Sequence, residues 1–125
     1  MSRTVLVVED ADGIAPLEMS LASLEGVTVL VLSSGRDALQ LIRSVSLELA
    51  AVITDLHLPY VDGFELIEEI RKQHRYATLP VLVISGDTRP ETPARVRRLG
   101  ANAFFAKPYS PGAIRHSLED LLHEK

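Results

Sequence analysis

An α/β domain with a doubly wound, five-stranded parallel sheet and helices on both faces is the fold that this sequence predicts. Three observations lead to it. Short apolar runs rich in valine, isoleucine and leucine recur along the chain. The runs do not alternate with polar residues, which is typical of strands that are covered on both faces. Segments with helical spacing separate the runs, and strands that alternate with helices indicate a parallel sheet.

The first part of the chain predicts a strand, a helix and a second strand. The run at residues 5–8 is the first strand. A helix follows over residues 12 to about 25, with Pro16 in its first turn, where a missing N–H costs little. Gly26 is expected to stop this helix, and the β-branched run at residues 27–32 is the second strand.

The middle of the chain predicts two helices around a third strand. Ser34 is the expected cap of the first of these helices. The strand at residues 51–54 ends in the carboxylate of Asp55. The helix that follows is expected to bury a stripe of residues at helical spacing, namely Phe64, Ile67 and Ile70.

The last part of the chain predicts two more pairs of a strand and a helix. The fourth strand is at residues 81–84 and the fifth at residues 103–106. The helix between them is expected to have Thr92 as its cap and Gly100 as its stop. Ser110 is the expected cap of the final helix, since a proline follows it directly.

One edge of this sheet is expected to collect the polar residues that end the strands. Right-handed crossovers leave few topologies, and the strand order 2-1-3-4-5 is the expected one at this length. In that order the carboxyl ends of the strands meet at one edge, where open α/β sheets place their ligands. The residues expected there are Glu9, Asp10, Asp55, Ser85 and Lys107.

The carboxylates of this group determine the chemistry that we expect. Two carboxylates about 4 Å apart repel by about 4 kcal/mol at an effective dielectric constant of about 20. A proton on one acid or a cation among them relieves the repulsion, and a hard divalent cation such as Mg²⁺ suits oxygen ligands. Asp55 then stays ionised and is able to attack phosphorus, while Lys107 offsets charge on the transferred group. The alternative is a structural cluster in which Lys107 only neutralises the acids.

The composition restricts the class of protein. With 125 residues, 46% of them hydrophobic and 24% charged, the chain is expected to form one globular domain over residues 1–125. The absence of cysteine excludes disulfides and thiolate metal sites. No apolar run approaches the ~20 residues of a membrane helix and the first residues lack a secretory segment, so we expect no membrane contact and a cytoplasmic location. A net charge of −4 argues against direct nucleic-acid binding.

These motifs resemble the receiver domains of bacterial two-component response regulators, the CheY-like family, over essentially the whole chain. The pieces that carry the resemblance are Glu9-Asp10 after the first strand, Asp55 with Pro59 and Asp62-Gly63, Ser85-Gly86, and Lys107-Pro108. The resemblance implies a flavodoxin-like fold and a phosphorelay in which a sensor histidine kinase or a phosphotransfer protein phosphorylates Asp55. Two departures are Ser85, where the family more often has threonine, and Leu58, where methionine is usual.

The resemblance also implies the ligands of a metal ion. In such domains residues that correspond to Asp10 and Asp55 bind Mg²⁺ or Mn²⁺, together with the backbone carbonyl at the position of His57. Glu9 is expected to assist through a water molecule. Lys107 and the hydroxyl at position 85 are expected to contact the phosphoryl group.

Two further features follow from the resemblance. The bond between Lys107 and Pro108 is usually cis in such domains. Phe104 stands where the family often has an aromatic switch residue, which reshapes the surface of the fourth helix, fifth strand and fifth helix together with Ser85. The alternative for Phe104 is a plain core residue, and since its ring has no hydroxyl, any switching must depend on packing.

The expected function is that of a phosphorylation-controlled signalling module, which catalyses only its own phosphorylation and dephosphorylation. An output partner, which the sequence does not identify, is expected at the switch surface. Three alternatives remain. One is a pseudo-receiver that binds partners without being phosphorylated. Another is a phosphatase of the aspartate-nucleophile type, which needs an acid two residues after the nucleophile, where this chain has His57. The third is a flavin-binding module, whose cofactor phosphate the acidic edge would repel.

Two loop residues flank the expected phosphorylation site. His57 lies two residues after Asp55, and Asp87 lies two residues after Ser85. In the family these positions tune how easily water reaches the phosphoryl group. We expect both side chains to be solvated; the alternative is that they pair over the site and slow dephosphorylation.

Overall fold

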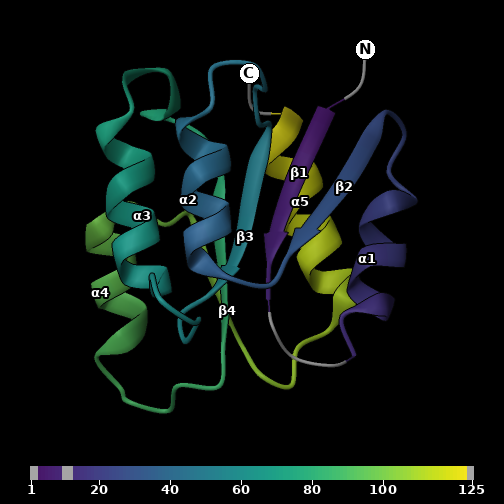
Figure 1. Cartoon of the computed structure of the whole chain (residues 1–125). Coiled ribbons are helices and arrows are strands. Elements are labelled where there is room, and N and C mark those ends of the chain that lie inside the picture. Colours follow the sequence, from purple (N-terminus) through teal and green to yellow (C-terminus); the bar gives the residue numbers. More distant parts are fainter. Residues whose placement is uncertain (1–2, 10–12, 124–125) are drawn as a thin grey trace.

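The computed structural model describes residues 3–9 and 13–123, whose strands form one parallel sheet between two layers of helices (Figure 1). The strand order is β2-β1-β3-β4-β5, so the predicted doubly wound fold is confirmed. The strands are β1 (Arg3–Val8), β2 (Val27–Leu32), β3 (Ala51–Asp55), β4 (Val81–Ser85) and β5 (Ala103–Ala106).

The helices divide between the two faces of the sheet, as Figure 1 shows. One layer consists of α1 (Ala15–Ala22) and α5 (Pro111–His123), which pack against each other. The other layer consists of α2 (Gly35–Arg43), α3 (Gly63–Lys72) and α4 (Thr92–Leu99), and a 3₁₀ turn, η1 (His74–Tyr76), follows α3. In the part of the chain that the structure describes, no helix has the length and apolarity that crossing a membrane requires.

The side chains of the strands alternate between two hydrophobic cores, one under each layer of helices. In β1, Val5 and Val7 pack toward α1 and α5, whereas Leu6 and Val8 pack toward α2 and α3. Every residue of β3 and β4 is buried. Burial on both faces explains why these strands appear in the sequence as continuous apolar runs.

The predicted caps were right where a serine precedes the helix. The Oγ atom of Ser34 accepts a hydrogen bond from the N–H of Asp37 at 3.1 Å at the start of α2. Ser110 does the same for Ala113 at 3.2 Å at the start of α5. The cap predicted at Thr92 was wrong, because Thr92 is itself the first residue of α4, and no side chain caps this helix.

The predicted end of the first helix was also wrong. α1 ends at Ala22, and the hydroxyl of Ser23 donates to the carbonyl oxygen of Ser20 at 2.6 Å. The N–H of Leu24 then bonds the carbonyl of Leu21 in a tighter turn. Gly26 lies in the turn before β2 with a φ of +77°, a conformation that favours glycine.

The pairing register aligns the ends of the strands at one edge of the sheet. Val8 pairs with Thr54, so that Glu9 and Asp55 follow at the same level. Ser85 pairs with Ala106, so that Lys107 follows next to them. The sheet therefore brings together, at its carboxyl edge, side chains that lie far apart in the sequence.

The hydroxyl of Tyr76 provides hydrogen-bond partners for two backbone groups of the loop that leads from α2 into β3. It accepts a hydrogen bond from the N–H of Leu49 at 2.9 Å and donates to the carbonyl oxygen of Leu47 at 3.3 Å. Tyr76 is 2% exposed and Leu49 is 3% exposed. A buried N–H that loses its partner keeps its full desolvation penalty.

Replacing Tyr76 by phenylalanine should therefore lower the free energy of unfolding by about 1–3 kcal/mol. Urea denaturation measures the change. Tyr60→Phe is the control, because this side chain is exposed, and its midpoint should equal that of the parent. An unchanged midpoint in Tyr76→Phe would mean that the Leu49 N–H finds another partner.

Candidate functional site

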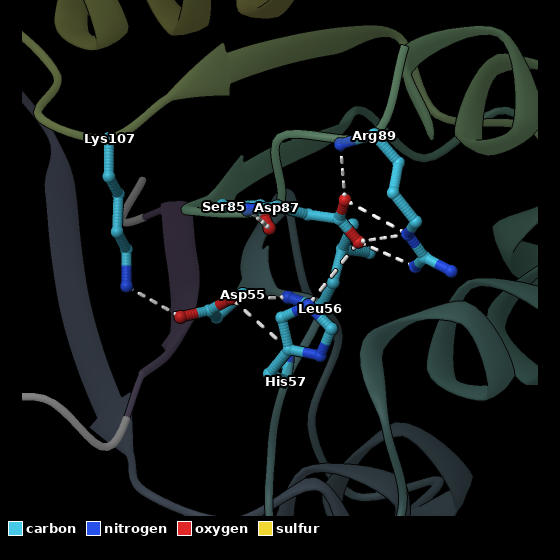
Figure 2. A network of polar contacts seen from close by, with 7 residues as sticks. All are labelled: Asp55, Leu56, His57, Ser85, Asp87, Arg89 and Lys107. Carbon is cyan, nitrogen blue, oxygen red and sulfur yellow. Dashed lines mark hydrogen bonds and ion pairs between the residues drawn. The ribbon is translucent and has the colours of Figure 1, made fainter. Parts of the chain in front are cut away.

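The ammonium group of Lys107 lies between two buried carboxylates at the carboxyl edge of the sheet. Its Nζ atom is 2.6 Å from Oδ2 of Asp55 and 2.8 Å from Oε2 of Glu9. Figure 2 shows the lysine side chain extended toward Asp55. Each acid is 5% exposed. The structure thus brings together three of the residues predicted to meet at this edge, from three different strand ends.

The alternation of the strands separates these residues into two groups. Glu9, Asp55 and Lys107 continue the positions of β1, β3 and β5 that pack toward α1 and α5. Ser85 continues the positions of β4 that face the other layer, and Phe104 packs against that same core. The two residues predicted to form the switch therefore lie on the side of the sheet that carries α4.

The carboxylate of Asp55 is held in one orientation. Its Oδ1 atom accepts hydrogen bonds from the backbone N–H groups of Leu56 at 2.6 Å and His57 at 3.2 Å (Figure 2). The hydroxyl of Thr54 donates to the Asp55 carbonyl oxygen at 2.8 Å. With Lys107 on Oδ2, each oxygen of this carboxylate has a partner, and charge-assisted contacts of this kind are strong.

The pKa values of the two groups beside Asp55 show how charge is balanced. Burial raises the pKa of the Glu9 carboxyl by more than the hydrogen bond from Lys107 lowers it, and the charge of Asp55 raises it further. Burial alone would lower the pKa of Lys107, but its hydrogen bonds to Asp55 and Glu9 together raise it. Lys107 therefore offsets the burial of Glu9 only in part.

Such an edge suits a hard divalent cation. Carboxylate and carbonyl oxygens are the ligands that Mg²⁺ prefers, and Glu9 and Asp55 supply two carboxylates whose repulsion a cation relieves. Asp10, the third expected acid, lies outside the described residues. Among residues 3–9 and 13–123, no group of three or more histidine, cysteine, aspartate or glutamate side chains is placed to hold a metal ion. The acids that are described fit the cation as part of a ligand set.

Ser85 lies beside the carboxylates with its hydroxyl oriented by the next loop. The side chain is fully buried, and its Oγ atom accepts a hydrogen bond from the N–H of Asp87 at 3.0 Å. The carbonyl oxygen of Ser85 accepts from the N–H of Lys107 at 2.8 Å, which ties the end of β4 to the end of β5. Because Oγ accepts from the backbone, its own proton is left to donate.

The expectation that His57 and Asp87 are both solvated was wrong for Asp87. The Asp87 side chain is 4% exposed, and its Oδ2 atom lies 3.4 Å from Nε2 of His57, whose side chain is 61% exposed. Arg89 holds the same carboxylate through its guanidinium and its backbone N–H (Figure 2). These hydrogen bonds lower the pKa of Asp87. Arg89 was not predicted as a site residue; the signal in the sequence is the aspartate two positions before it.

An open cavity of about 400 Å³ adjoins Glu9 and Lys107. Tyr109 and Pro108 line it from the β5–α5 loop, and the bond between Lys107 and Pro108 is cis, as the resemblance implied. Burial raises the pKa of Tyr109, and the charge of Glu9 adds to this effect. The sequence analysis did not single out Tyr109, whose only signal was its place two residues after Lys107.

We expect the loss of Lys107 to destabilise the protein in a manner that depends on pH. Lys107→Met leaves Glu9 and Asp55 without their cation, at a cost between the ~1 kcal/mol of an exposed pair and the ~3–5 kcal/mol of a fully buried one. The pKa of Glu9 is raised above 4.5, so its folded form binds a proton more tightly than its unfolded form. Protonation of Glu9 relieves its repulsion with Asp55. The difference in the free energy of unfolding between Lys107→Met and the parent should therefore narrow as the pH falls toward 4.5.

Urea denaturation at a series of pH values measures this gap. Lys72→Met is the matched control, because Lys72 pairs with Glu69 at 3.1 Å but has a side chain that is 72% exposed. It should leave stability nearly unchanged at every pH. A gap for Lys107→Met that stays constant between neutral pH and pH 4.5 would contradict the electrostatic explanation.

Comparison with known proteins identifies the family of this chain. Residues 5–119 match the model of the response regulator receiver domain. The regulatory protein VanRc of Enterococcus gallinarum is 32% identical over 111 residues, which is 89% of this chain and 46% of that protein. The chain spans less than half of the length of this relative and of two others, at 46%, 44% and 15%.

Two solved structures have the same fold. The chemotaxis response regulator CheY4 of Vibrio cholerae superposes with a TM-score of 0.84 at 26% identity, covering 97% of this chain and 99% of that one. The receiver domain of the sensor histidine kinase PA1611 of Pseudomonas aeruginosa has a TM-score of 0.82 at 24% identity, with 98% of each chain covered. That domain is described with a magnesium ion coordinated in its active-site cleft. With its sheet order, its acidic edge and the family match over most of its length, this chain belongs to the receiver domains of two-component response regulators.

Proposed function

We propose that Asp55 is the phosphoacceptor of a two-component phosphorelay. It takes a phosphoryl group from a phosphohistidine of a sensor histidine kinase or a phosphotransfer protein. The observation that carries this proposal is that Lys107 brings Asp55 and Glu9 together. Its Nζ atom lies 2.6 Å from Asp55 and 2.8 Å from Glu9. A carboxylate that is buried, oriented and paired with a cation at a strand end is placed for chemistry with an anionic donor.

The residues of the chain divide the work of the transfer. An oxygen of Asp55 attacks phosphorus while the bond from phosphorus to the donor imidazole nitrogen breaks, and that nitrogen keeps the electron pair. Lys107 offsets charge on the phosphoryl oxygens, and the hydroxyl of Ser85 donates a hydrogen bond to one of them. Asp10, Asp55 and the carbonyl of His57 would hold Mg²⁺ or Mn²⁺, with Glu9 assisting through a water molecule. When bound, the ion supplies positive charge that keeps Asp55 ionised and neutralises the phosphoryl group.

Signalling is favoured over hydrolysis by the residue two positions after Asp55. An aspartate-nucleophile phosphatase needs a carboxyl group there as general acid and base, whereas this chain presents the imidazole of His57, held toward Asp87. The output of the switch is then a change at the surface of α4, β5 and α5, where a partner of unknown identity binds. Phe104, half-buried beside the core under α4, is the residue that would transmit it by packing.

The proposal is tested by incubating the protein with Mg²⁺ and a small phosphodonor and measuring the intact mass. A phosphoryl adduct is expected in the parent and should be absent from Asp55→Asn, since the amide cannot form an aspartyl phosphate. Asp120→Asn is the matched control, because this exposed residue lies on α5, and it should keep the adduct. A parent without an adduct under several donors would favour the pseudo-receiver instead.

The contact between His57 and Asp87 leads to a second expected outcome. Arg89 fixes Asp87, and Asp87 holds the His57 side chain over the loop after Asp55, where it limits the approach of water. His57→Ala should therefore shorten the lifetime of the phosphoryl group, by at most about fivefold because the pair is partly exposed. Decay of the adduct in a chelator measures this lifetime.

A second histidine pair provides the control for this measurement. His116 lies 3.5 Å from Asp120 on α5, and His116→Ala removes a comparable contact away from the site. Its phosphoryl lifetime should equal that of the parent. Equal lifetimes for His57→Ala and the parent would end the idea that this pair controls dephosphorylation.

A further inference from the structure

The loop of residues 56–62, which follows Asp55, is closed at its base and strained at its tip. The N–H of Gly63 donates to the carbonyl oxygen of Leu56 at 2.9 Å and closes the loop. At the tip, the N–H of Val61 donates to the carbonyl of Pro59 at 2.9 Å around Tyr60, whose φ is +72°. This is the rare form of γ-turn, and it places a bulky residue in a left-handed conformation that costs free energy. Strain of this kind persists only where surrounding structure enforces it.

The start of α2 supplies the enforcing contacts. A Cβ atom on Gly35 would lie 1.7 Å from the carbonyl oxygen of Val61, so the helix and the loop tip touch at a point where only glycine fits. The next residue, Arg36, places its guanidinium carbon 4.3 Å from the centre of the Tyr60 ring. The ring is 76% exposed, so this stacking, rather than burial, holds it. We call Gly35 and Arg36 the α2 brace.

The base of the loop is part of the site. The N–H of His57 holds Oδ1 of Asp55 at 3.2 Å. A Cβ atom on Gly63 would lie 2.2 Å from the Asp55 carbonyl oxygen, so the end of the loop also packs directly on Asp55. In the chain, the carbonyl of His57, the proposed metal ligand, follows the first of these contacts and precedes the second. Its direction depends on the path of the loop, and the α2 brace determines that path at the tip.

We propose that the α2 brace is a positioning element for the metal site: Gly35 and Arg36 hold the tip of the 56–62 loop so that the His57 carbonyl keeps the direction that Mg²⁺ binding needs. The inference rests on the proposed Mg²⁺-dependent function and deepens it. Neither residue belongs to the proposed ligands of the ion or to the proposed contacts of the phosphoryl group. A loop that is free at its tip would still fold, but it would have to be ordered when the ion binds.

The first test removes the guanidinium group of Arg36, which stacks on the Tyr60 ring. Arg36→Ala should weaken Mg²⁺ binding by about two- to fivefold, the range expected for an exposed stacking contact. A titration with Mg²⁺, followed by backbone amide chemical shifts, gives the dissociation constant without any phosphodonor. Arg95→Ala is the matched control, because Arg95 stacks 3.8 Å from the ring of Phe64 in a different place, and it should bind Mg²⁺ like the parent.

The other partner of the stacked pair allows a rescue experiment. Tyr60→Ala should weaken Mg²⁺ binding as Arg36→Ala does, while Tyr60→Phe keeps a ring for the guanidinium and should retain the affinity of the parent. A role limited to stability would shift the urea midpoint and leave the Mg²⁺ dissociation constant unchanged in all of these variants. That pattern would overturn the proposal.

Gly35→Ala tests the close approach itself. The added methyl group must push the loop tip or the helix aside by more than an ångström, and Mg²⁺ binding should weaken by about tenfold or more. Gly112→Ala is the control, since its nearest neighbour would be the Ser110 Oγ at an ordinary 3.8 Å. If Gly35→Ala does not fold, the comparison of Arg36→Ala with Arg95→Ala still decides.

The outcomes separate this inference from the proposed function. A parent that binds Mg²⁺ together with an Arg36→Ala variant of equal affinity overturns the brace and leaves the proposed function intact. A parent that binds no Mg²⁺ overturns both. Weaker Mg²⁺ binding in Arg36→Ala, Tyr60→Ala and Gly35→Ala supports the brace. The variants Arg95→Ala, Tyr60→Phe and Gly112→Ala should then bind Mg²⁺ like the parent.

Discussion

The contact on which the site depends is that of one ammonium group with two buried carboxylates. Lys107 reaches Glu9 and Asp55 because β1, β3 and β5 end at the same edge of the sheet. Acids at this depth are unfavourable without positive charge, and burial keeps the pKa of Glu9 raised even with Lys107 beside it. Such an edge suits the further cation that the proposed function requires.

Two loops convert this edge into an ordered site, and each is held from outside. The loop after β3 is held at its tip by Gly35 and Arg36. The loop after β4 is held by Asp87, whose carboxylate is held by Arg89 and whose N–H bonds Ser85. The contact of Asp87 with His57 joins the two loops. Both loops beside Asp55 are thus held by residues outside the proposed set of ligands and phosphoryl contacts.

The sequence was sufficient for the parts that follow from periodicity. Strand ends in a parallel sheet share one edge, so Glu9, Asp55 and Lys107 could be placed together before any coordinates were known. Caps at Ser34 and Ser110 were predictable because a capping side chain acts within its own turn. The contacts of the α2 brace were not, because nothing near Gly35 in the sequence indicates that Val61 will lie against it.

The errors at the helix ends, in contrast, concern residues only a few positions apart in the chain. Thr92 has the sequence of a cap, yet α4 begins at Thr92 itself, after Glu91, and no side chain caps its first turn. The early end of α1 reflects the competition of the Ser23 hydroxyl for a helix carbonyl. In both cases the helix boundary lies a few residues or less from the predicted one, beside a polar residue of a type common at helix ends.

Under the proposed function, the position of Ser85 limits how a signal would leave the site. Its Oγ atom accepts from the Asp87 N–H and is still able to donate a proton, so contact with a phosphoryl oxygen does not require the loop after β4 to open. Under the proposed function, a change at α4 would pass through Phe104, which packs on the same side of the sheet as Ser85. Because its ring has no hydroxyl to bond, Phe104 could contribute to the proposed switch by packing alone.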